Sequence, residues 1–250
     1  MDITKYLERI NYTGVIDVND DLLTKLHRMH VHEIPFENLD VYYKRPFDLS
    51  IENIYKKVVN NVRGGFCYEL NLLFHCLLTE IGFSSRIIAS RIVNQDGTVG
   101  PEFDHMSLCV KTGKEFLVDV GYGDLFVTPI EIKGDVQSDG QNYFKIDPWK
   151  KGEYIVSMSP DGADFSKRYT FTLEPVKAED FHAICLDKQT NSDSYFVKNV
   201  ICTRPTETGR VTIFNDKLIE TIRGSRIETA IEGDRNFTRL LKEKFGIVIQ

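Results

Sequence analysis

The chain has 250 residues, of which 42% are hydrophobic and 27% are charged, and its formal net charge is -6. A chain of this length can bury a sizeable core, as one compact unit or as two to three subdomains. The acidic balance argues against a nucleic-acid partner, which would need clustered Lys and Arg, but it does not exclude a phosphorylated small molecule.

The first third of the chain has the periodicity of helices. Asn19 can cap a helix that continues to about His30, and Pro35 ends that segment. A second helix is expected over about residues 50–60. After Gly64 and Gly65 a third helix begins near residue 67 and reaches residue 81, where Gly82 closes it.

After residue 82 the period of the apolar residues changes from 3.6 to about 2, which predicts antiparallel strands. Glycine-containing turns separate these strands: Asp96-Gly97, Thr112-Gly113 and Lys151-Gly152. The expected strands are residues 85–93, 105–110, 115–122, 143–147 and 153–158. A helix is expected over about 178–188, strands near 197–204 and 210–214, and a terminal helix near 235–245.

This order of elements predicts an α+β fold. We expect a helical bundle over residues 1–82, an antiparallel β-barrel over residues 83–190 and a mixed segment over residues 191–250.

The N-terminal segment MDITKYLERI carries charges where a signal peptide needs an apolar run, so we expect a cytoplasmic protein. The longest apolar stretch, residues 70–78, is far too short to cross a bilayer. Five cysteines without a CxxC pair indicate reduced thiols and disfavour a zinc site, so no metal is expected.

Cys67 is the cysteine whose surroundings favour chemistry. It follows Gly64 and Gly65, which permit a tight turn and close approach of another molecule. Cys67 also falls in the first turn of a predicted helix, where free N–H groups and the helix dipole stabilise a thiolate. Arg63 and Glu69 can form a buried pair that fixes this loop, or they can be a solvated pair. The remaining cysteines lie in or beside apolar runs and are interpreted as structural: 76, 109, 185 and 202.

A cysteine nucleophile needs a base, and the base needs an orienting carboxylate. Six histidines are candidates, at positions 27, 30, 32, 75, 105 and 182. His105 opens one predicted strand, and Asp119 lies inside the next. A three-residue turn over residues 111–113 places the two side chains opposite each other on one face. A two-residue Thr112-Gly113 loop would instead set Met106 against Asp119 and turn His105 away.

Several motifs resemble those of the arylamine N-acetyltransferase family and occur in that family's order. They are RGGFCYELN at 63–71, IPFENLD at 34–40, DHMSL at 104–108, VDVGYGD at 118–124 and YFVKNVICTRPTETGR at 195–210. The resemblance covers most of the chain and is similar to compact bacterial members. It implies a helical bundle, a β-barrel and a C-terminal α/β lid.

The resemblance also implies a function. It implies transfer of an acetyl group from acetyl-coenzyme A to an arylamine, arylhydrazine or N-hydroxyarylamine, as in xenobiotic metabolism, by a ping-pong reaction through acetyl-Cys67. His105 and Asp119 match the other two members of the family's triad. The implied protein is a monomer or a homodimer.

Other positions acquire roles through the same resemblance. Phe36 matches a position that lines the acceptor pocket. A group of residues matches segments near coenzyme A: Gly121, Tyr122, Gly123, Thr206 and Gly209. Tyr122 stands where many relatives have Phe. Each of these residues also has a structural reading, in which Phe36 belongs to the core, the glycines serve a turn and Thr206 caps one.

Two rival functions share these features. A cysteine hydrolase or transglutaminase-like enzyme has the same order of Cys, His and Asp along the chain. A non-catalytic binder of small molecules could use the same scaffold without a reactive thiol.

Overall fold

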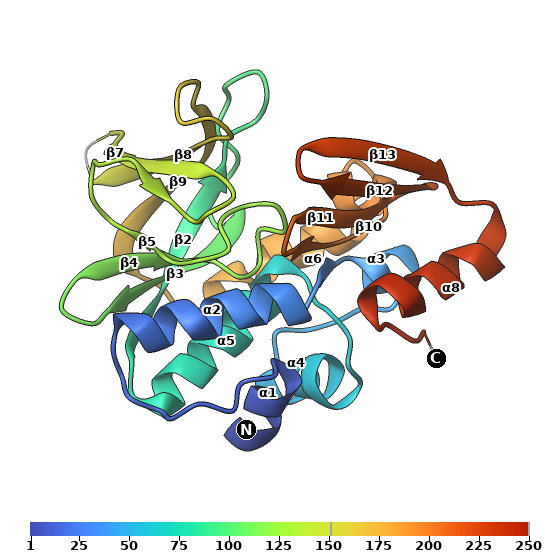
Figure 1. Cartoon of the computed structure of the whole chain (residues 1–250), viewed down its shortest axis with the longest axis horizontal. Helices are drawn as coiled ribbons and strands as arrows, with labels where there is room; N and C mark the ends of the chain where they lie inside the picture. Colours follow the sequence, from blue (N-terminus) through green and yellow to red (C-terminus); the bar gives the residue numbers. More distant parts are fainter. Residues whose placement is uncertain (151, 250) are drawn as a thin grey trace.

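The computed structural model describes residues 1–150 and 152–249. Helices from the first third of the chain form one layer, and two separate β-sheets stand against it (Figure 1). The larger sheet follows the helices in sequence, and the smaller one is formed mostly by the C-terminal segment. The fold is therefore α+β, as predicted.

The N-terminal helices begin and end close to their predicted bounds. Helix α2 has Asn19 as its cap, and the Asn19 side chain accepts from the N–H of Leu22 at 2.9 Å. The third predicted helix, α5, ends at Gly82, which has a left-handed φ of 112° that suits glycine. The bounds are α1 Ile3–Arg9, α2 Asp20–Glu33, α3 Leu39–Tyr42, α4 Ile51–Tyr55, the π-helical turn η1 Lys56–Asn60 and α5 Cys67–Ile81.

The larger sheet has eight strands in the order β5-β4-β3-β2-β9-β8-β7-β6, antiparallel throughout. Their bounds are β2 Ser84–Ile92, β3 His105–Lys111, β4 Glu115–Val118, β5 Ile130–Glu131, β6 Gln137–Ser138, β7 Tyr143–Pro148, β8 Glu153–Ser159 and β9 Ser166–Pro175. Strands β5, β6 and β9 were not predicted. Gly152 lies in the third predicted turn with φ 78°, whereas Lys151 is outside the described residues.

The smaller sheet has the order β1-β10-β11-β12-β13. Its bounds are β1 Phe36–Glu37, β10 Ile201–Thr206, β11 Gly209–Phe214, β12 Lys217–Ile222 and β13 Ser225–Ala230. Strand β1 comes from the helical third of the chain, so this sheet joins the two ends of the sequence. The strand expected from residue 197 was wrong at its start, because residues Tyr195–Lys198 form the short helix α7. Strands β12 and β13 were also missed.

Three helical segments complete the chain: the 3-10 turn η2 Ala178–Phe181 with α6 His182–Thr190, and the terminal helix α8 Gly233–Phe245. Helix α8 packs Phe237, Leu241 and Phe245 into a hydrophobic cluster with strands β10 to β12 (Figure 1). Separate clusters fill the helical layer and the inside of the larger sheet. The division of the chain at residues 82 and 190 stays a prediction. None of the helices in the described part of the chain is long and apolar enough to cross a membrane.

Candidate catalytic site

Cys67 is the first residue of α5, as the sequence predicted. The preceding residue, Phe66, is extended and acts as the helix cap. The loop before it is held against residues 35–37: Glu37 N–H donates to the Gly65 carbonyl at 2.9 Å, and Gly65 N–H donates to the Pro35 carbonyl at 3.3 Å. A Cβ at position 64 would collide with that same carbonyl, so the close approach requires glycine. The loop that precedes the nucleophile candidate is therefore fixed against residues 35–37.

His105 and Asp119 form a buried pair. The distance between His105 Nε2 and Asp119 Oδ2 is 2.6 Å, and the two side chains are 4% and 0% exposed. Because Nε2 is occupied by the carboxylate, Nδ1 is the ring nitrogen that can exchange a proton with another group. The ring centroids of Tyr122 and Tyr169 lie 5.5 Å and 5.4 Å from the centroid of the His105 imidazole, so the two rings pack against it.

The strand register that brings them together differs from the predicted one. The turn lies at residues 112–114, with Lys111 opposite Glu115, so His105 is not directly opposite Asp119. Strand β4 ends at Val118, and Asp119 begins the following loop. The prediction was wrong by two residues, but a shift of two keeps every side chain on its face. His105 therefore still reaches Asp119, and the Thr112-Gly113 alternative is wrong.

The loop after β4 lies against the start of α5. A Cβ built on Gly121 would be 2.7 Å from the Cys67 carbonyl oxygen and 2.9 Å from Cys67 Cα. The missing side chain at Gly121 thus lets the loop that carries Asp119 touch the backbone of the nucleophile candidate. This backbone contact brings Cys67 to the loop that holds the His105–Asp119 pair.

Asn71, which the sequence analysis did not select, joins the same elements. Its Nδ2 donates to Asp119 Oδ1 at 2.8 Å and to the Met106 carbonyl at 2.7 Å, and its Oδ1 accepts from Val120 N–H at 2.9 Å. A signal was available, because Asn71 is four residues after Cys67 and so lies on the same helix face. A buried amide with all of these bonds fixes the carboxylate oxygen that His105 does not use.

The His27 side chain contacts the backbone N–H of Asp119. Its Nδ1 contacts the Val127 carbonyl at 3.1 Å, and Asp119 N–H lies 3.4 Å from its Nε2. This arrangement requires a neutral ring with the proton on Nδ1. Burial lowers the pKa of His27 to about 4, so the ring remains neutral at physiological pH. The His27 side chain is fully buried.

The surroundings shift the pKa of Asp119 and the pKa of the Cys67 thiol in opposite directions. Burial by itself would raise the pKa of Asp119, but His105 and hydrogen bonds from Asn71 and Gly121 lower that pKa overall. Burial raises the pKa of the Cys67 thiol well above its ordinary value, and the Lys188 ammonium on α6 opposes that rise. A thiolate at Cys67 therefore needs a cation beside it.

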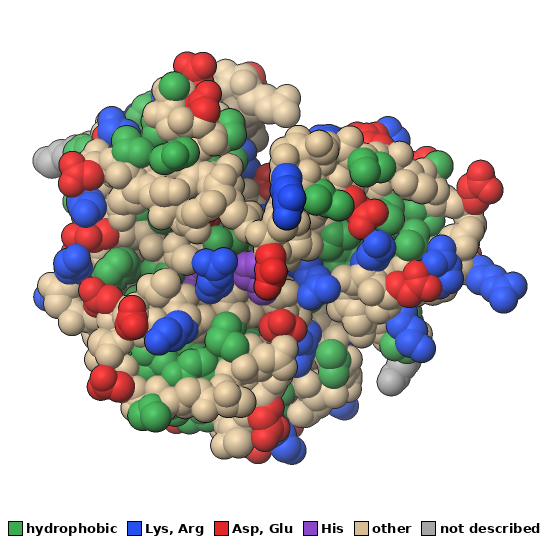
Figure 2. Space-filling view, in the orientation of Figure 1, with side chains coloured by type: hydrophobic (Ala, Val, Ile, Leu, Met, Phe, Trp, Pro, Cys, Tyr) green, Lys and Arg blue, Asp and Glu red, His purple; other side chains and the backbone are tan. Residues whose placement is uncertain are grey.

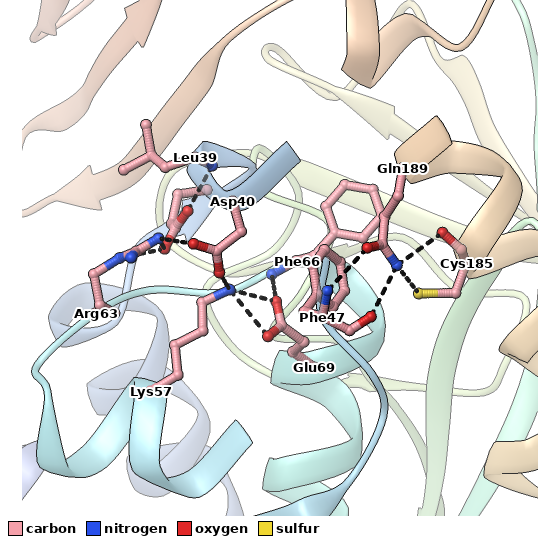
Figure 3. Close-up of polar contacts among 10 residues, drawn as sticks. Leu39, Asp40, Phe47, Lys57, Arg63, Phe66, Glu69, Cys185 and Gln189 are labelled. Carbon is pink, nitrogen blue, oxygen red and sulfur yellow. Dashed lines mark hydrogen bonds and ion pairs between the residues drawn. The ribbon is translucent and has the colours of Figure 1, made fainter. Parts of the chain in front are cut away.

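The expected partnership of Arg63 and Glu69 was wrong, although both residues are buried. Arg63 donates to Glu37 at 2.7 Å and to Asp40 at 3.1 Å. Glu69 instead accepts from Lys57 at 2.8 Å (Figure 3). Lys57 lies in η1 and Glu69 lies in α5. Because the two residues belong to different helices, no periodic pattern in the sequence indicated their contact.

Phe36 is 7% exposed and lines a small cavity with Asp119, Tyr122 and Gly123. Arg210 from β11 donates to the Gly123 carbonyl and to Thr203 Oγ1 at 3.3 Å, which ties the smaller sheet to the loop that carries Asp119. The role of Phe36 toward an acceptor stays a prediction.

Two of the predicted coenzyme A contacts have structural duties. Thr206 and Gly209 face each other at the β10–β11 turn, where a Cβ on Gly209 would collide with the Thr221 carbonyl. The Thr206 carbonyl accepts from Gln141 at 3.0 Å. Gly123 has a φ of 97°, which favours glycine. Contacts of these residues with coenzyme A, like those of Gly121 and Tyr122, stay predictions.

Among residues 1–150 and 152–249 no three His, Cys, Asp or Glu side chains gather in a way that could hold a metal ion. The five cysteines are free thiols. On the face shown in Figure 2, acidic and basic side chains are interspersed, and a notch separates the two lobes at the top.

Comparisons with known proteins agree with this arrangement. A family model described as N-acetyltransferase matches residues 20–250. The pineal gland isozyme NAT-3 of arylamine N-acetyltransferase from Gallus gallus is 30% identical over 275 residues, covering 100% of this chain and 95% of that protein. The structure of Mycobacterium marinum arylamine N-acetyltransferase in complex with CoA has a TM-score of 0.90 at 28% identity, covering 98% and 93%. The (BACCR)NAT3 arylamine N-acetyltransferase from Bacillus cereus, described with a Cys-His-Glu triad, has a TM-score of 0.91 at 25% identity and full coverage of both chains.

Proposed function

The chain belongs to the arylamine N-acetyltransferase family of acyltransferases, and we propose that it transfers acetyl from acetyl-coenzyme A to an arylamine, arylhydrazine or N-hydroxyarylamine through acetyl-Cys67. The observation that carries this proposal is the 2.6 Å contact between His105 Nε2 and Asp119 Oδ2, on a loop that touches the Cys67 backbone. A buried carboxylate–imidazole pair beside a thiol supports nucleophilic catalysis.

In the first half-reaction the Cys67 proton moves to His105 Nδ1. Because burial raises the pKa of the thiol, the thiolate forms only as a pair with the imidazolium, and Asp119 stabilises that cation. The thiolate attacks the thioester carbonyl carbon, a bond to Cys67 Sγ forms, and the bond to the coenzyme A sulfur breaks. The imidazolium then returns its proton to the departing thiolate.

In the second half-reaction the amine nitrogen attacks the acetyl-Cys67 carbonyl. The C–N bond forms, the bond to Sγ breaks, and the amine loses a proton that reaches Cys67 through His105. Anilines suit this step because they are largely neutral at pH 7. The low exposure of Cys67, His105 and Asp119, each at most 4%, supports transfer over hydrolysis, because a buried site limits the access of water.

The test is intact mass after mixing the protein with acetyl-coenzyme A alone. We expect a gain of one acetyl group that maps to Cys67 and disappears when aniline is added, with acetanilide as product. Cys67→Ser should remain folded and unlabelled, and Cys76→Ser, which changes a partly exposed cysteine outside the triad, is the matched control. Cleavage or crosslinking of protein substrates in place of acetanilide would favour a cysteine hydrolase or transglutaminase-like enzyme.

A further inference from the structure

A continuous chain of buried charges lies beside the loop that carries Cys67 (Figure 3). Its members are Glu37, Arg63, Asp40, Lys57 and Glu69, in the order in which they contact one another. Three are acids and two are bases. Arg63 in this series of charges precedes Gly64-Gly65 in the sequence, and Glu69 follows them. The series therefore contacts the segment before Cys67 at both of its ends.

Glu69 occupies the end of this series of charges that lies in the first turn of α5. It is the third residue of α5, and its Oε2 accepts from the N–H of the capping residue Phe66 at 2.8 Å. This bond satisfies a helix-start donor that has no partner within the helix. Glu69 is 1% exposed, so its carboxylate places a negative charge in the interior two residues after Cys67.

Lys57 supplies the compensating charge. Its Nζ lies 3.0 Å and 2.8 Å from the two oxygens of Glu69 and 2.7 Å from Asp40 Oδ2. The side chain is 13% exposed and reaches these groups from the π-helical turn η1. Burial by itself would lower the pKa of Lys57, but the surrounding acids raise that pKa overall, so the side chain is charged at neutral pH.

We propose that Lys57 is a positioning residue that neutralises Glu69, so that Glu69 caps the nucleophile helix without placing an uncompensated negative charge beside the Cys67 thiolate. This inference rests on the proposed role of Cys67. The two functions of the cap conflict, because an anion satisfies the Phe66 N–H well and at the same time opposes ionisation of the thiol. The Lys57 ammonium, which Glu69 shares with Asp40, offsets the second effect and keeps the first.

Other charged and titratable groups act on the Cys67 thiol. They are Lys188 and Cys185 on α6, Asp104 just before β3 and Asp119 after β4, while Tyr68 on α5 is affected by Cys67 and His105 is hydrogen-bonded to Asp119. None of them changes in the variants proposed below, so differences between variants report on Lys57 and Glu69.

The experiment measures alkylation of Cys67 by iodoacetamide as a function of pH, in the full chain, with labelling mapped to that residue. Lys57→Met leaves a buried anion and should move the profile to higher pH, slowing alkylation at pH 6 by about threefold or more. Glu69→Gln keeps an oxygen acceptor for Phe66 but removes the anion, so it should move the profile to lower pH. The double variant should alkylate within about twofold of the unmodified protein.

Lys25→Met is the matched control, because Lys25 forms an exposed pair with Asp21 at 3.4 Å and should leave the profile unchanged. A purely structural role predicts shifts of one sign, or slower reaction in all variants, and either result would overturn the proposal. Should Lys57→Met fail to fold, the direction of the Glu69→Gln shift still decides. Failure of the proposed function would be separate, because the unmodified protein would then not accept acetyl at Cys67, whatever its alkylation profile.

Discussion

Gly121→Ala tests whether the contact between the catalytic loop and the nucleophile helix controls the reaction. The added Cβ would lie 2.7 Å from the Cys67 carbonyl oxygen and from Asn71 Nδ2, about 0.7 Å inside the 3.4 Å at which ordinary contact begins. Neither neighbour can give way easily. The first is backbone of α5, and the second is an amide that holds Asp119 and Met106.

The loop must therefore move away from α5 by several tenths of an ångström. Overpacking of this kind costs about 1–3 kcal/mol of folding free energy. A displacement of nearly 1 Å between reacting groups can lower the rate by about 10²-fold. Because the loop moves by less than 1 Å, we expect Gly121→Ala to lower kcat/KM for acetyl-coenzyme A and aniline by about 10- to 10²-fold while the protein stays folded.

The assay combines steady-state kinetics with single-turnover acetylation of Cys67, and urea unfolding measures the stability. Gly134→Ala is the control, because a Cβ at Gly134 meets nothing within 4 Å and the residue has no left-handed φ. Normal kcat/KM in Gly121→Ala, with unfolding free energy within about 0.5 kcal/mol of the parent protein, would refute the argument.

Three further predictions concern the groups around the pair. Asp119→Asn should lower kcat by about 10³- to 10⁴-fold through the wrong His105 tautomer, with exposed Asp193→Asn as control; a loss below about tenfold would contradict the assigned role. Asn71→Ala leaves the Met106 carbonyl and Val120 N–H without this partner, so urea unfolding should show a loss of about 2–4 kcal/mol, and a loss under about 1 kcal/mol would be inconsistent with it. His27 has a folded pKa of about 4, below the ordinary value of about 6.5, so the unfolded state binds more protons between these values and stability falls as pH drops through that window. Lowering the pH from 8 to 5 should reduce the free energy of unfolding by about 2 kcal/mol through His27 alone. In urea unfolding, His27→Gln should therefore lose less stability over this pH range than the parent protein, and an equal loss would exclude the mechanism.

The pH dependence of catalysis follows from the same site. If the thiolate forms by proton transfer to His105, as proposed, alkylation of Cys67 should report the thiol and imidazole as a coupled pair and not as two independent groups.

The sequence alone determined the elements whose signals are local. Periodicity and the Gly82 stop placed α5 over residues 67–81, and Asn19 placed the start of α2. The predicted position of Cys67 at a helix start needed only the glycines before it. Even the shared face of His105 and Asp119 followed from alternation, since a register error of two residues preserves the face.

The tertiary structure decided the contacts between segments that the sequence separates. Residues 36–37 pair with residues 202–203 across the length of the chain, and Lys57 reaches Glu69 from another helix. The partner of a buried charge depends on which backbone segments meet, and that is settled by burial of the whole core instead of by any local pattern. Periodicity and capping act over a few residues, so the sequence was enough to propose the reacting groups. The tertiary structure determined which amide, imidazole and ammonium contact the residues around them.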